Sequence, residues 1–331
     1  MKTGKVSESI LKRSILKKCT FRHPQVICGA GTGNDSAVLD VKGKTVASAS
    51  VHTAALHFLS DISYEVEHAM NNLACSGCLS EAVLLSILLP KECAETELKQ
   101  IMDRAAEACQ RWKVQIAGGH TEVSAFVQHP VLTVTALGTA TEEVVQIKNA
   151  EPGMDILITG TVGLEGTVLL AKAFEQELLE KFPLDLVEQS KNLAPTICIA
   201  REAQEAKQAG AAALHDLSQG GVFGALWEFC DGASVGMEAD LRKIPIRQET
   251  VELCEFFGLN PYCMRSGGSL LIAAADGANM KARLQQQGIA SEIIGRTTNS
   301  NDRIFRNGSE TRFLDKPVQD ELLAFMEKRG L

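Results

Sequence analysis

The sequence lacks the clustered basic residues, long apolar runs and secretion signal that mark several large classes of protein. Its 331 residues include 33 Lys and Arg against 41 Asp and Glu, which gives a net charge of −8. No basic run exceeds Lys17-Lys18, whereas nucleic-acid binding depends on clustered cations that neutralise phosphates. We therefore expect no nucleic-acid partner.

No apolar stretch approaches the roughly 20 residues that a membrane-spanning helix needs. The longest, residues 83–89, has the length of a strand and contains Ser86. The basic N-terminal segment also lacks the continuous apolar region and small-residue cleavage site of a signal peptide. We expect a chain that spans no membrane and resides in the cytoplasm.

The ten cysteines are scattered along the chain, and the absence of a dense cysteine framework is typical of a reducing compartment. Cys75 and Cys78 have CxxC spacing, but no second Cys or His pair follows at the spacing of a zinc site. We interpret them as thiols near a helix end, and most of the others as small core residues. His52, His57 and His68 are likewise interpreted as structural or surface residues.

The hydrophobic pattern of the first half predicts alternating strands and helices. Apolar residues between positions 64 and 75 recur at helical spacing, so this segment should form a helix with one buried face. A second apolar stripe predicts a helix over residues 95–112. The expected strands cover residues 38–49, 82–89, 114–117 and 131–140. These elements indicate an α/β or α+β unit that ends near residue 150.

Pro152-Gly153 is a strong breaker pair, and we place a domain boundary there, between residues 1–150 and 151–331. Beyond it the pattern restarts and predicts a second α/β domain of similar size. Its strands are expected at 155–159, up to His215-Asp216, and at 237–241, 270–274 and 292–296. Its helices are expected at 166–181, after Pro195, from Gly221, and at 247–257, 279–287 and 318–328. The polar segment 297–312 should form a surface hairpin or loop.

The first segment that could carry chemistry is rich in glycine. Glycines at positions 29, 31 and 33 precede the polar pair Asn34-Asp35 and a predicted strand. Such glycines let the backbone turn so that its N–H groups can approach an anion. The segment is neither a Walker A loop nor a dinucleotide fingerprint, because no Lys-Ser/Thr pair follows and the glycine spacing differs. An ordinary glycine turn would explain it equally well.

The second segment is AGGHTEV, at the end of a predicted strand. Its glycine pair, Gly118-Gly119, is followed by an imidazole, a hydroxyl and a carboxylate, from His120, Thr121 and Glu122. Groups of this kind can bind phosphate, orient a metal-bound water or move protons. The alternative is a loop with a solvated histidine.

The third segment, HDLSQGG, runs from His215 to Gly221. Asp216 and Ser218 precede Gly220-Gly221, which open a predicted helix. A helix N-terminus accepts anions because its free N–H groups and its dipole point outward. Asp216 could equally serve only as an N-cap. A fourth segment, RSGGS at 265–269, is a glycine turn before a strand.

Taken in this order, the four segments resemble the superfamily of aminoimidazole ribonucleotide synthase, thiamine-monophosphate kinase, selenophosphate synthetase and the hydrogenase maturation factor HypE. In the first half, GNDSAVL, MNNLA and AGGHTEV are similar to its GDDAAVL, its VNDLA and its GGDT, GGET or GGHS turn. In the second half, GMDILITGTVGLEG, HDLSQGG, KIPIR and GLNPYCMRSGG are similar to the GDKIIVSGTIGDHG, RDPTRGG, IPVR and GLDPLYxANEG of the HypE branch. The resemblance covers nearly the whole chain, and the HypE branch is the closest.

The resemblance implies an α/β (α+β) fold of two AIR-synthase-like domains, in which the N-terminal domains of a homodimer build a shared β-barrel. It also implies ATP and Mg²⁺ near that interface, and a reaction in which ATP phosphorylates an oxygen, or a comparable atom, of an acceptor. In the HypE branch the acceptor is the carbamoyl amide on a C-terminal Cys. Activation and dehydration convert it to a thiocyanate, the precursor of the cyanide ligands of nickel-iron hydrogenase.

The matching motif positions imply the residues of the site. Asp35 and Asn72 would hold the metal, and His120, Glu122 and Asp216 would take part in catalysis. The residues implied to bind the nucleotide are Gly31, Gly33, Asn34, Asp35, Asn72, Gly118, Gly119, Thr121, Ser218, Gly220 and Gly221.

Several positions depart from the family pattern. Family aspartates correspond to Asn72 and His120 here, and a third falls near residues 49–51, which contain no carboxylate. Magnesium prefers hard oxygen ligands, commonly carboxylates, so its binding should be weakened. His120 could instead contact phosphate when protonated or act as a general base when neutral.

HypE ends in Pro-Arg-Ile-Cys, whereas this sequence ends Gly330-Leu331 and its last cysteine is Cys263. We therefore expect a different acceptor, either a small molecule or a maturation partner protein. Three interpretations of the function stay open. The chain could be a HypE-like ATP-dependent enzyme, a degenerate non-catalytic dimer that binds nucleotide or a partner, or a small-molecule kinase of the thiamine-monophosphate kinase or selenophosphate synthetase type.

Overall fold

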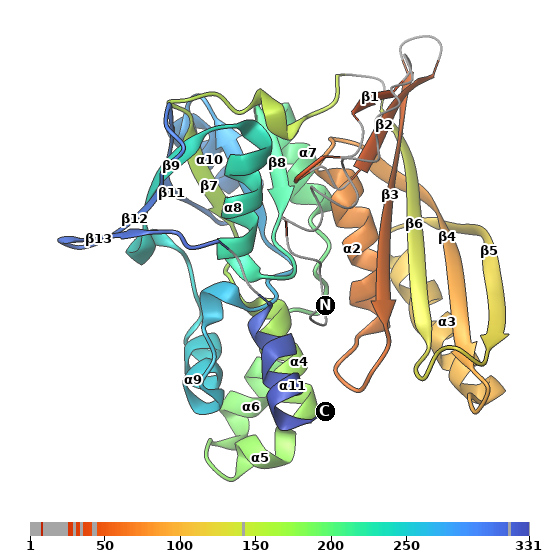
Figure 1. The fold of residues 1–331 in the computed structure, drawn as a ribbon. Coiled ribbons are helices and arrows are strands. Elements are labelled where there is room, and N and C mark those ends of the chain that lie inside the picture. The colour runs from red at the N-terminus through yellow and green to blue at the C-terminus, as the bar shows by residue number, and fades with distance from the viewer. Residues whose placement is uncertain are drawn as a thin grey trace.

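The computed structural model describes residues 8, 26–28, 31–33, 36–41, 45–140, 143–316 and 319–330. Two mixed β-sheets stand side by side, and each is packed against helices (Figure 1). The first sheet contains the strands up to residue 140, and the second begins at residue 155. The boundary predicted near residue 150 falls in the segment between them.

The first sheet has six strands in the order β1-β2-β3-β6-β4-β5. All neighbouring pairs are antiparallel except β4 and β5, which are parallel. The strand bounds are β1 Val26–Cys28, β2 Ser36–Val41, β3 Thr45–Ala55, β4 Leu79–Pro90, β5 Gln115–Ser124 and β6 Val131–Ala140.

One face of this sheet is covered by α2 (Ile62–Ala74) and α3 (Glu95–Arg111). The residue pattern of β6 explains why the helices cover only one face. Leu132 and Val134 are fully buried against the helices, while Thr133, between them, faces the other side of the sheet. Asp61 is the N-cap of α2, and its carboxylate accepts a hydrogen bond from the backbone N–H of Ser63 at 3.1 Å.

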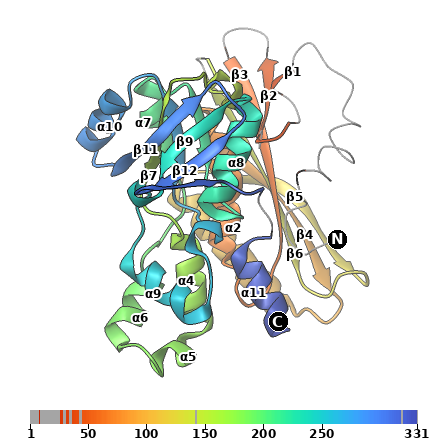
Figure 2. The ribbon, with the colours of Figure 1, turned by 60° about the vertical axis from the view of Figure 1, so that its left-hand side comes forward.

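The second sheet has seven strands in the order β13-β12-β9-β11-β7-β10-β8. Helices α7 and α10 supply core residues on one face and α8 on the other, so the sheet is buried on both sides (Figure 2). The strands are β7 Asp155–Thr159, β8 Ala213–Asp216, β9 Gly236–Asp240, β10 Leu270–Ala274, β11 Ser291–Thr298, β12 Arg303–Asn307 and β13 Glu310–Phe313. The helices are α7 Ala200–Gln208, α8 Gly221–Ala233 and α10 Gly277–Gln286.

A helical layer lies below the second sheet in Figure 1. It consists of α4 (Leu164–Ala173), α5 (Glu175–Leu179), α6 (Leu184–Lys191), α9 (Gln248–Phe257) and α11 (Glu321–Arg329). Its core contains Phe174, Phe257 and Phe325, whose rings pack with centroids 5.2 to 5.5 Å apart. The Arg329 guanidinium lies over these rings and so fixes α11 against the layer.

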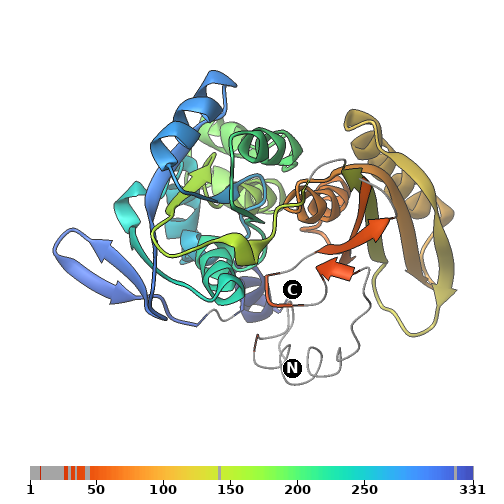
Figure 3. The same ribbon diagram turned by 90° about the horizontal axis from the view of Figure 1, so that it is seen from above.

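Helix α2 lies between the two sheets when the molecule is viewed from above (Figure 3). Residues 194–199 of the second half cross this helix with their backbone groups paired. Glu67 accepts the Ile197 N–H at 2.8 Å, and Asn71 donates to Ile197 O at 2.8 Å and accepts the Ile199 N–H at 2.9 Å. Because these partners are buried, the two halves of the chain are joined by a buried, hydrogen-bonded contact.

The predicted fold class is confirmed, and the predicted strands at 131–140, 155–159 and 270–274 match the structure residue for residue. The segment predicted as one helix over 166–181 is instead divided into α4 and α5, and α6 was not predicted. The polar segment 297–312 contains the hairpin of β12 and β13. Within the part of the chain that the structure describes, no helix is long and apolar enough to cross a membrane.

Candidate functional site

One side of α2 is turned toward the second half of the chain and carries polar side chains. Glu65, His68, Asn72 and Cys75 follow one another at the spacing of a single helix face. All four contact residues that come from beyond position 160. The interface between the two halves is therefore where the candidate site can be built.

Asp216 ends β8 at this interface and is only 2% exposed. The Asn72 amide, oriented so that its nitrogen faces acceptors, donates to Asp216 Oδ1 at 3.3 Å and to the His68 carbonyl at 3.2 Å. The Cys75 thiol lies 4.0 Å from the same carboxylate oxygen. The predicted pair Asn72 and Asp216 is thus brought together. Asp216 does not cap α8, because the N-cap residue is Gly220.

The turn between β8 and α8 requires glycine. Gly220 and Gly221 both have positive φ, +85° and +62°, which side chains disfavour. A Cβ on Gly221 would also lie 2.5 Å from Tyr262 O and 2.7 Å from Met264 O. The carbonyl of Ser218 accepts the Ser266 N–H at 3.2 Å. The third and fourth segments of the sequence analysis therefore form one packed unit.

The N-terminus of α8 already holds a carboxylate of the same chain. Asp320 Oδ2 accepts the Gly220 N–H at 2.8 Å, and Oδ1 accepts the Leu322 N–H at 2.9 Å. Burial raises the pKa of Asp320 to about 6, against the lowering effects of the Gly220 hydrogen bond and the charge of Arg265. In this structure Asp320 occupies the position at which the sequence predicted an anion.

A cluster of buried ionised groups adjoins this turn. Arg265 Nε lies 2.8 Å from Glu165 Oε1, and His68 Nε2 lies 3.0 Å from the same oxygen. The other oxygen of Glu165 accepts the Gly267 N–H at 3.0 Å. Burial would raise the pKa of Glu165, but the charges of Arg265 and His68 outweigh it and lower the pKa to about 2.

The cluster continues toward the first sheet. His52 Nε2 lies 2.6 Å from Glu65 Oε2, and Arg265 Nη2 lies 3.5 Å from Glu65 Oε1. Burial lowers the pKa of His68, but the interaction with Glu165 outweighs it and the net shift is upward. His68 therefore favours the protonated state, which balances the two carboxylates together with Arg265.

Sequence reasoning assigned no chemistry to these ionised residues. His52 and His68 were interpreted as structural or surface residues, and neither Glu65 nor Glu165 was singled out. One signal was present, because Glu65 and His68 lie three residues apart on the same face of α2, beside its apolar stripe.

The first glycine-rich segment packs against a different part of α8 from the Gly220-Gly221 turn. Gly33 has φ +71°, and a Cβ there would lie 3.1 Å from Glu228 O. A Cβ on Gly232 would lie 2.8 Å from Thr32 O. Gly31 to Gly33 therefore pack on the C-terminal half of the helix, about 10 Å along its axis from Gly221. Asn34 and Asp35 lie outside the described residues.

His120 and Glu122 lie on β5, and their side chains are 66% and 57% exposed. His120 Nε2 is 3.2 Å from Glu122 Oε2, so the carboxylate can orient the imidazole. Both residues face the open side of the first sheet, since they pair with Ser86 and Leu88 of β4. Gly119 allows the close pairing, because a Cβ there would lie 1.8 Å from Leu85 O.

Strand β5 is the edge strand farthest from β1 in the first sheet. Two strands, β6 and β4, separate it from β3, so it lies about 14 Å from β3 across the sheet. The structure consequently divides the predicted residues into three groups. They are Gly31 with Gly33, then Asn72 with Asp216, Ser218, Gly220 and Gly221, and finally Gly118, Gly119, His120, Thr121 and Glu122.

The donors near Asp216 can be compared with what magnesium requires. Magnesium takes near-octahedral oxygen ligation, and the predicted group of Asn72, Asp216, Ser218, Gly220 and Gly221 contains a single carboxylate, that of Asp216. Across the described ranges, no three His, Cys, Asp or Glu side chains gather as a metal site would need. Asp35, the other predicted ligand, lies outside the described residues. The described side chains do not by themselves fit a magnesium site.

The sequence matches the AIR synthase related protein family over both halves. Residues 33–140 match its N-terminal domain and residues 151–306 its C-terminal domain. A Methanocaldococcus jannaschii protein named for hydrogenase expression and formation is 25% identical over 329 residues, 96% of each chain. The carbamoyl dehydratase HypE of Cupriavidus necator is 27% identical over 270 residues, 78% of this chain and 75% of HypE.

Solved structures share the fold. One chain of a solved HypE–HypF complex superposes with a TM-score of 0.71 at 19% identity, covering 93% of this chain and 100% of the other. HypE in complex with ATP gives 0.67 at 18% identity, covering 97% of each chain. ThiL complexed with AMPPCP and TMP gives 0.70 at 20% identity, covering 94% and 98%.

Proposed function

The chain belongs to the AIR synthase related family, and we propose that it is a HypE-like enzyme that uses ATP to phosphorylate, and so activate, an amide or carbamoyl oxygen of an acceptor. The observation that carries the proposal is the Asp216 carboxylate, held by the Asn72 amide at 3.3 Å beside the glycine turn that opens α8. The similarity to HypE, which has been solved with ATP, supports the choice of nucleotide.

The reaction would be an in-line displacement. The acceptor oxygen attacks the γ-phosphorus, the bond from that phosphorus to the β–γ bridging oxygen breaks, and ADP leaves. The acceptor loses a proton, which a base in the site must take. Asp216 and the His120–Glu122 pair are the two candidates. Each combines a basic atom with a neighbour that fixes its position.

These two groups lie apart within one chain, so the proposal includes a homodimer. The open face of the first sheet carries Val51 of β3 and Leu84 of β4, 57% and 38% exposed, which pair with the same residue, Thr135, of the strand β6 between them. A second copy of the chain packed on this face would bury them. The same contact would enclose His120 and Glu122, which point from that face, so that they can serve the site of the other copy.

The acceptor could reach the site as a small molecule or on a maturation partner protein. The solved HypE–HypF complex shows that a protein of this fold assembles with another protein. A carbamoyl group carried by a partner protein would provide an acceptor with the chemistry that the proposed reaction requires.

The experiment is ATP turnover by purified protein with three acceptor types in parallel. They are a carbamoylated cysteine peptide, thiamine monophosphate and selenide. ADP formation that depends on the carbamoyl peptide supports the proposal, and dependence on one of the other two would assign a small-molecule kinase instead. Turnover that survives when Asp216→Asn and His120→Ala are combined would contradict the site.

A second candidate is a non-catalytic dimer that binds nucleotide or a partner. The observation in its favour is the replacement of family aspartates by Asn72 and His120, together with a donor set that does not fit magnesium. Calorimetry separates the two. ATP binding indifferent to magnesium, without turnover of any acceptor, supports the non-catalytic dimer.

A further inference from the structure

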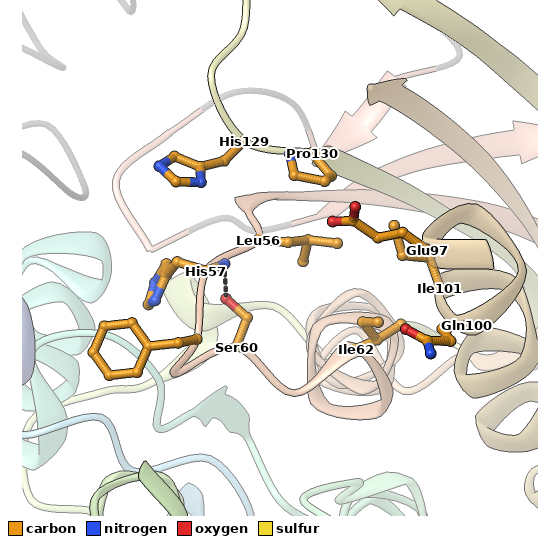
Figure 4. Close-up of a pocket in the computed structure, with 10 residues that line it drawn as sticks. Leu56, His57, Ser60, Ile62, Glu97, Gln100, Ile101, His129 and Pro130 are labelled. Atoms are coloured by element: carbon orange, nitrogen blue, oxygen red, sulfur yellow. Dashed lines mark hydrogen bonds between the residues drawn. The ribbon is translucent and has the colours of Figure 1, made fainter. Parts of the chain in front are cut away.

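A cavity of about 320 Å³ opens at the other end of α2 (Figure 4). It lies between the loop after β3, the first turns of α3 and the loop before β6, and Leu56, Ile101 and Pro130 form its apolar floor. Its volume is within the range of small-molecule sites. Ile62 lines it, and Asn72 lies ten residues farther along α2, about 15 Å away. The cavity is therefore separate from the Asn72–Asp216 group.

The cavity is held open by hydrogen bonds within its walls. Leu56 N donates to Pro130 O at 2.7 Å and joins two of the three segments. The His57 N–H donates to Ser60 Oγ at 3.0 Å, and Ser60 N donates to His57 O at 2.8 Å. A ligand would thus meet a preformed site, which lowers the entropic cost of binding.

The imidazole of His57 has a defined role as a donor. Its Nδ1 accepts the Leu59 N–H at 3.2 Å, so in the neutral ring Nε2 carries the proton. Burial and the charge of Arg265 lower the pKa of His57, which keeps this ring neutral near pH 7. His57 adds hydrogen-bonding capacity to the cavity without adding positive charge.

The described residues that line the cavity include one carboxylate, Glu97, and no Lys or Arg. Figure 4 shows the Glu97 carboxylate directed across the cavity, between Leu56 and Pro130. The Cys93 thiol donates to its Oε2 at 3.2 Å. A phosphate group would meet this negative charge with no cation beside it, so the cavity is unsuited to a nucleotide.

We propose that this cavity binds a small organic cation, an amine or guanidinium attached to an apolar body. The cationic group pairs with Glu97, and the apolar body lies on Leu56, Ile101 and Pro130. Phe58, 56% exposed, also lines the cavity and offers its aromatic ring to the rest of the ligand. The site is independent of ATP and of the proposed reaction.

The test uses three probes of similar shape and different charge: benzylammonium, benzyl alcohol and benzoate. Binding is followed by NMR through the imidazole signals of His57 and His129, which also lines the cavity. Benzylammonium should bind saturably and shift both histidines, benzyl alcohol should bind more weakly, and benzoate should leave them unchanged. Glu97→Gln should weaken benzylammonium about fivefold, the value of one exposed ion pair.

Glu107→Gln is the matched control, because Glu107 is an exposed carboxylate of the same helix outside the cavity lining. It should leave the affinity for benzylammonium unchanged. Equal binding of benzoate, or equal loss of affinity in both variants, would overturn the proposal. Failure of all three probes to move the histidine signals would overturn it as well.

Discussion

His68 on α2 and Glu165 at the start of α4 lie 3.0 Å apart, Nε2 to Oε1, across the contact between the two halves of the chain. Both side chains are almost completely buried, at 2% and 0% exposure. Arg265 completes the arrangement at 2.8 Å from the same oxygen. The position of α2 relative to the second sheet thus depends on a charge-balanced cluster that neither half can complete alone.

Removing one member of this cluster should destabilise the protein strongly. Glu165→Ala leaves Arg265 and His68 buried without their carboxylate, and breaking a buried pair in this way costs about 3–5 kcal/mol. Urea unfolding should show this loss as a lower midpoint. Glu107→Ala, which breaks an exposed pair with Arg104, should cost at most about 1 kcal/mol. Similar midpoints for the two variants would contradict the account.

Asp320 should make stability depend on pH. Its pKa is raised to about 6 in the folded chain from an ordinary value of 3.8, so the stability it contributes is present below pH 3.8 and is lost as pH rises through 6. Asp320→Asn removes this titration. The variant should therefore gain stability relative to the wild type between pH 4 and 6.5, by about 2–3 kcal/mol. A difference in unfolding free energy that is constant over this range would contradict the assignment.

His68 and the two glutamates of the buried cluster lose their contributions to stability at opposite ends of the pH range. The pKa of His68 is raised, so its contribution is complete below pH 6.5 and is lost as pH rises further. Glu65 and Glu165, with pKa values lowered to about 2, contribute above pH 4.5 and lose that stability on acidification. His68→Gln should flatten the alkaline side of the stability profile, measured by unfolding between pH 6 and 9. Because His68 also helps to lower the pKa of Glu165, the variant should lose less stability than the wild type as pH falls below 4.5.

The proposed homodimer can be tested through the open sheet face. Leu84→Asp places a charge among exposed apolar residues that a second copy would bury, so the variant should shift from dimer to monomer in light scattering. Phe313→Asp is the control, since Phe313 is 64% exposed on β13 in the other sheet. A wild-type chain that is monomeric at micromolar concentration would contradict the dimer.

If each active site contains residues from both copies of a dimer, two inactive variants should complement each other when they are mixed. His120→Ala and Asp216→Asn chains should each be nearly inactive, yet a mixed dimer contains one unaltered site. Random mixing should therefore restore about one quarter of the wild-type turnover. Turnover that stays at the level of the single variants would show that both residues serve the site of their own chain.

Local patterns predicted most of the fold, because alternation and helical spacing depend on neighbours in sequence. The exception at β5 is instructive. The glycine pair Gly118-Gly119 was interpreted as a sharp turn that ends the strand at residue 117. In the structure a bulge lets the strand continue to Ser124 beside β4. The division of residues 166–181 into α4 and α5 likewise follows from packing around Phe174 rather than from a breaker in the sequence.

The candidate site was only partly predictable. Asn72 and Asp216 were found through motif positions and do meet in space. Glu165 and Arg265 were not assigned to chemistry, since their partner His68 lies 97 and 197 residues away in sequence. No local pattern could show that Asp320 occupies the N-terminus of α8, because that contact spans 100 residues.

The central claim, that this chain uses ATP at the Asn72–Asp216 group, is tested most directly by calorimetry. ATP is titrated into the wild type and into Asp216→Asn, each with and without magnesium. The account predicts one ATP per chain for the wild type and a clear change in affinity or in magnesium dependence for the variant. Absence of binding under both conditions, or identical titrations for the two proteins, would contradict it.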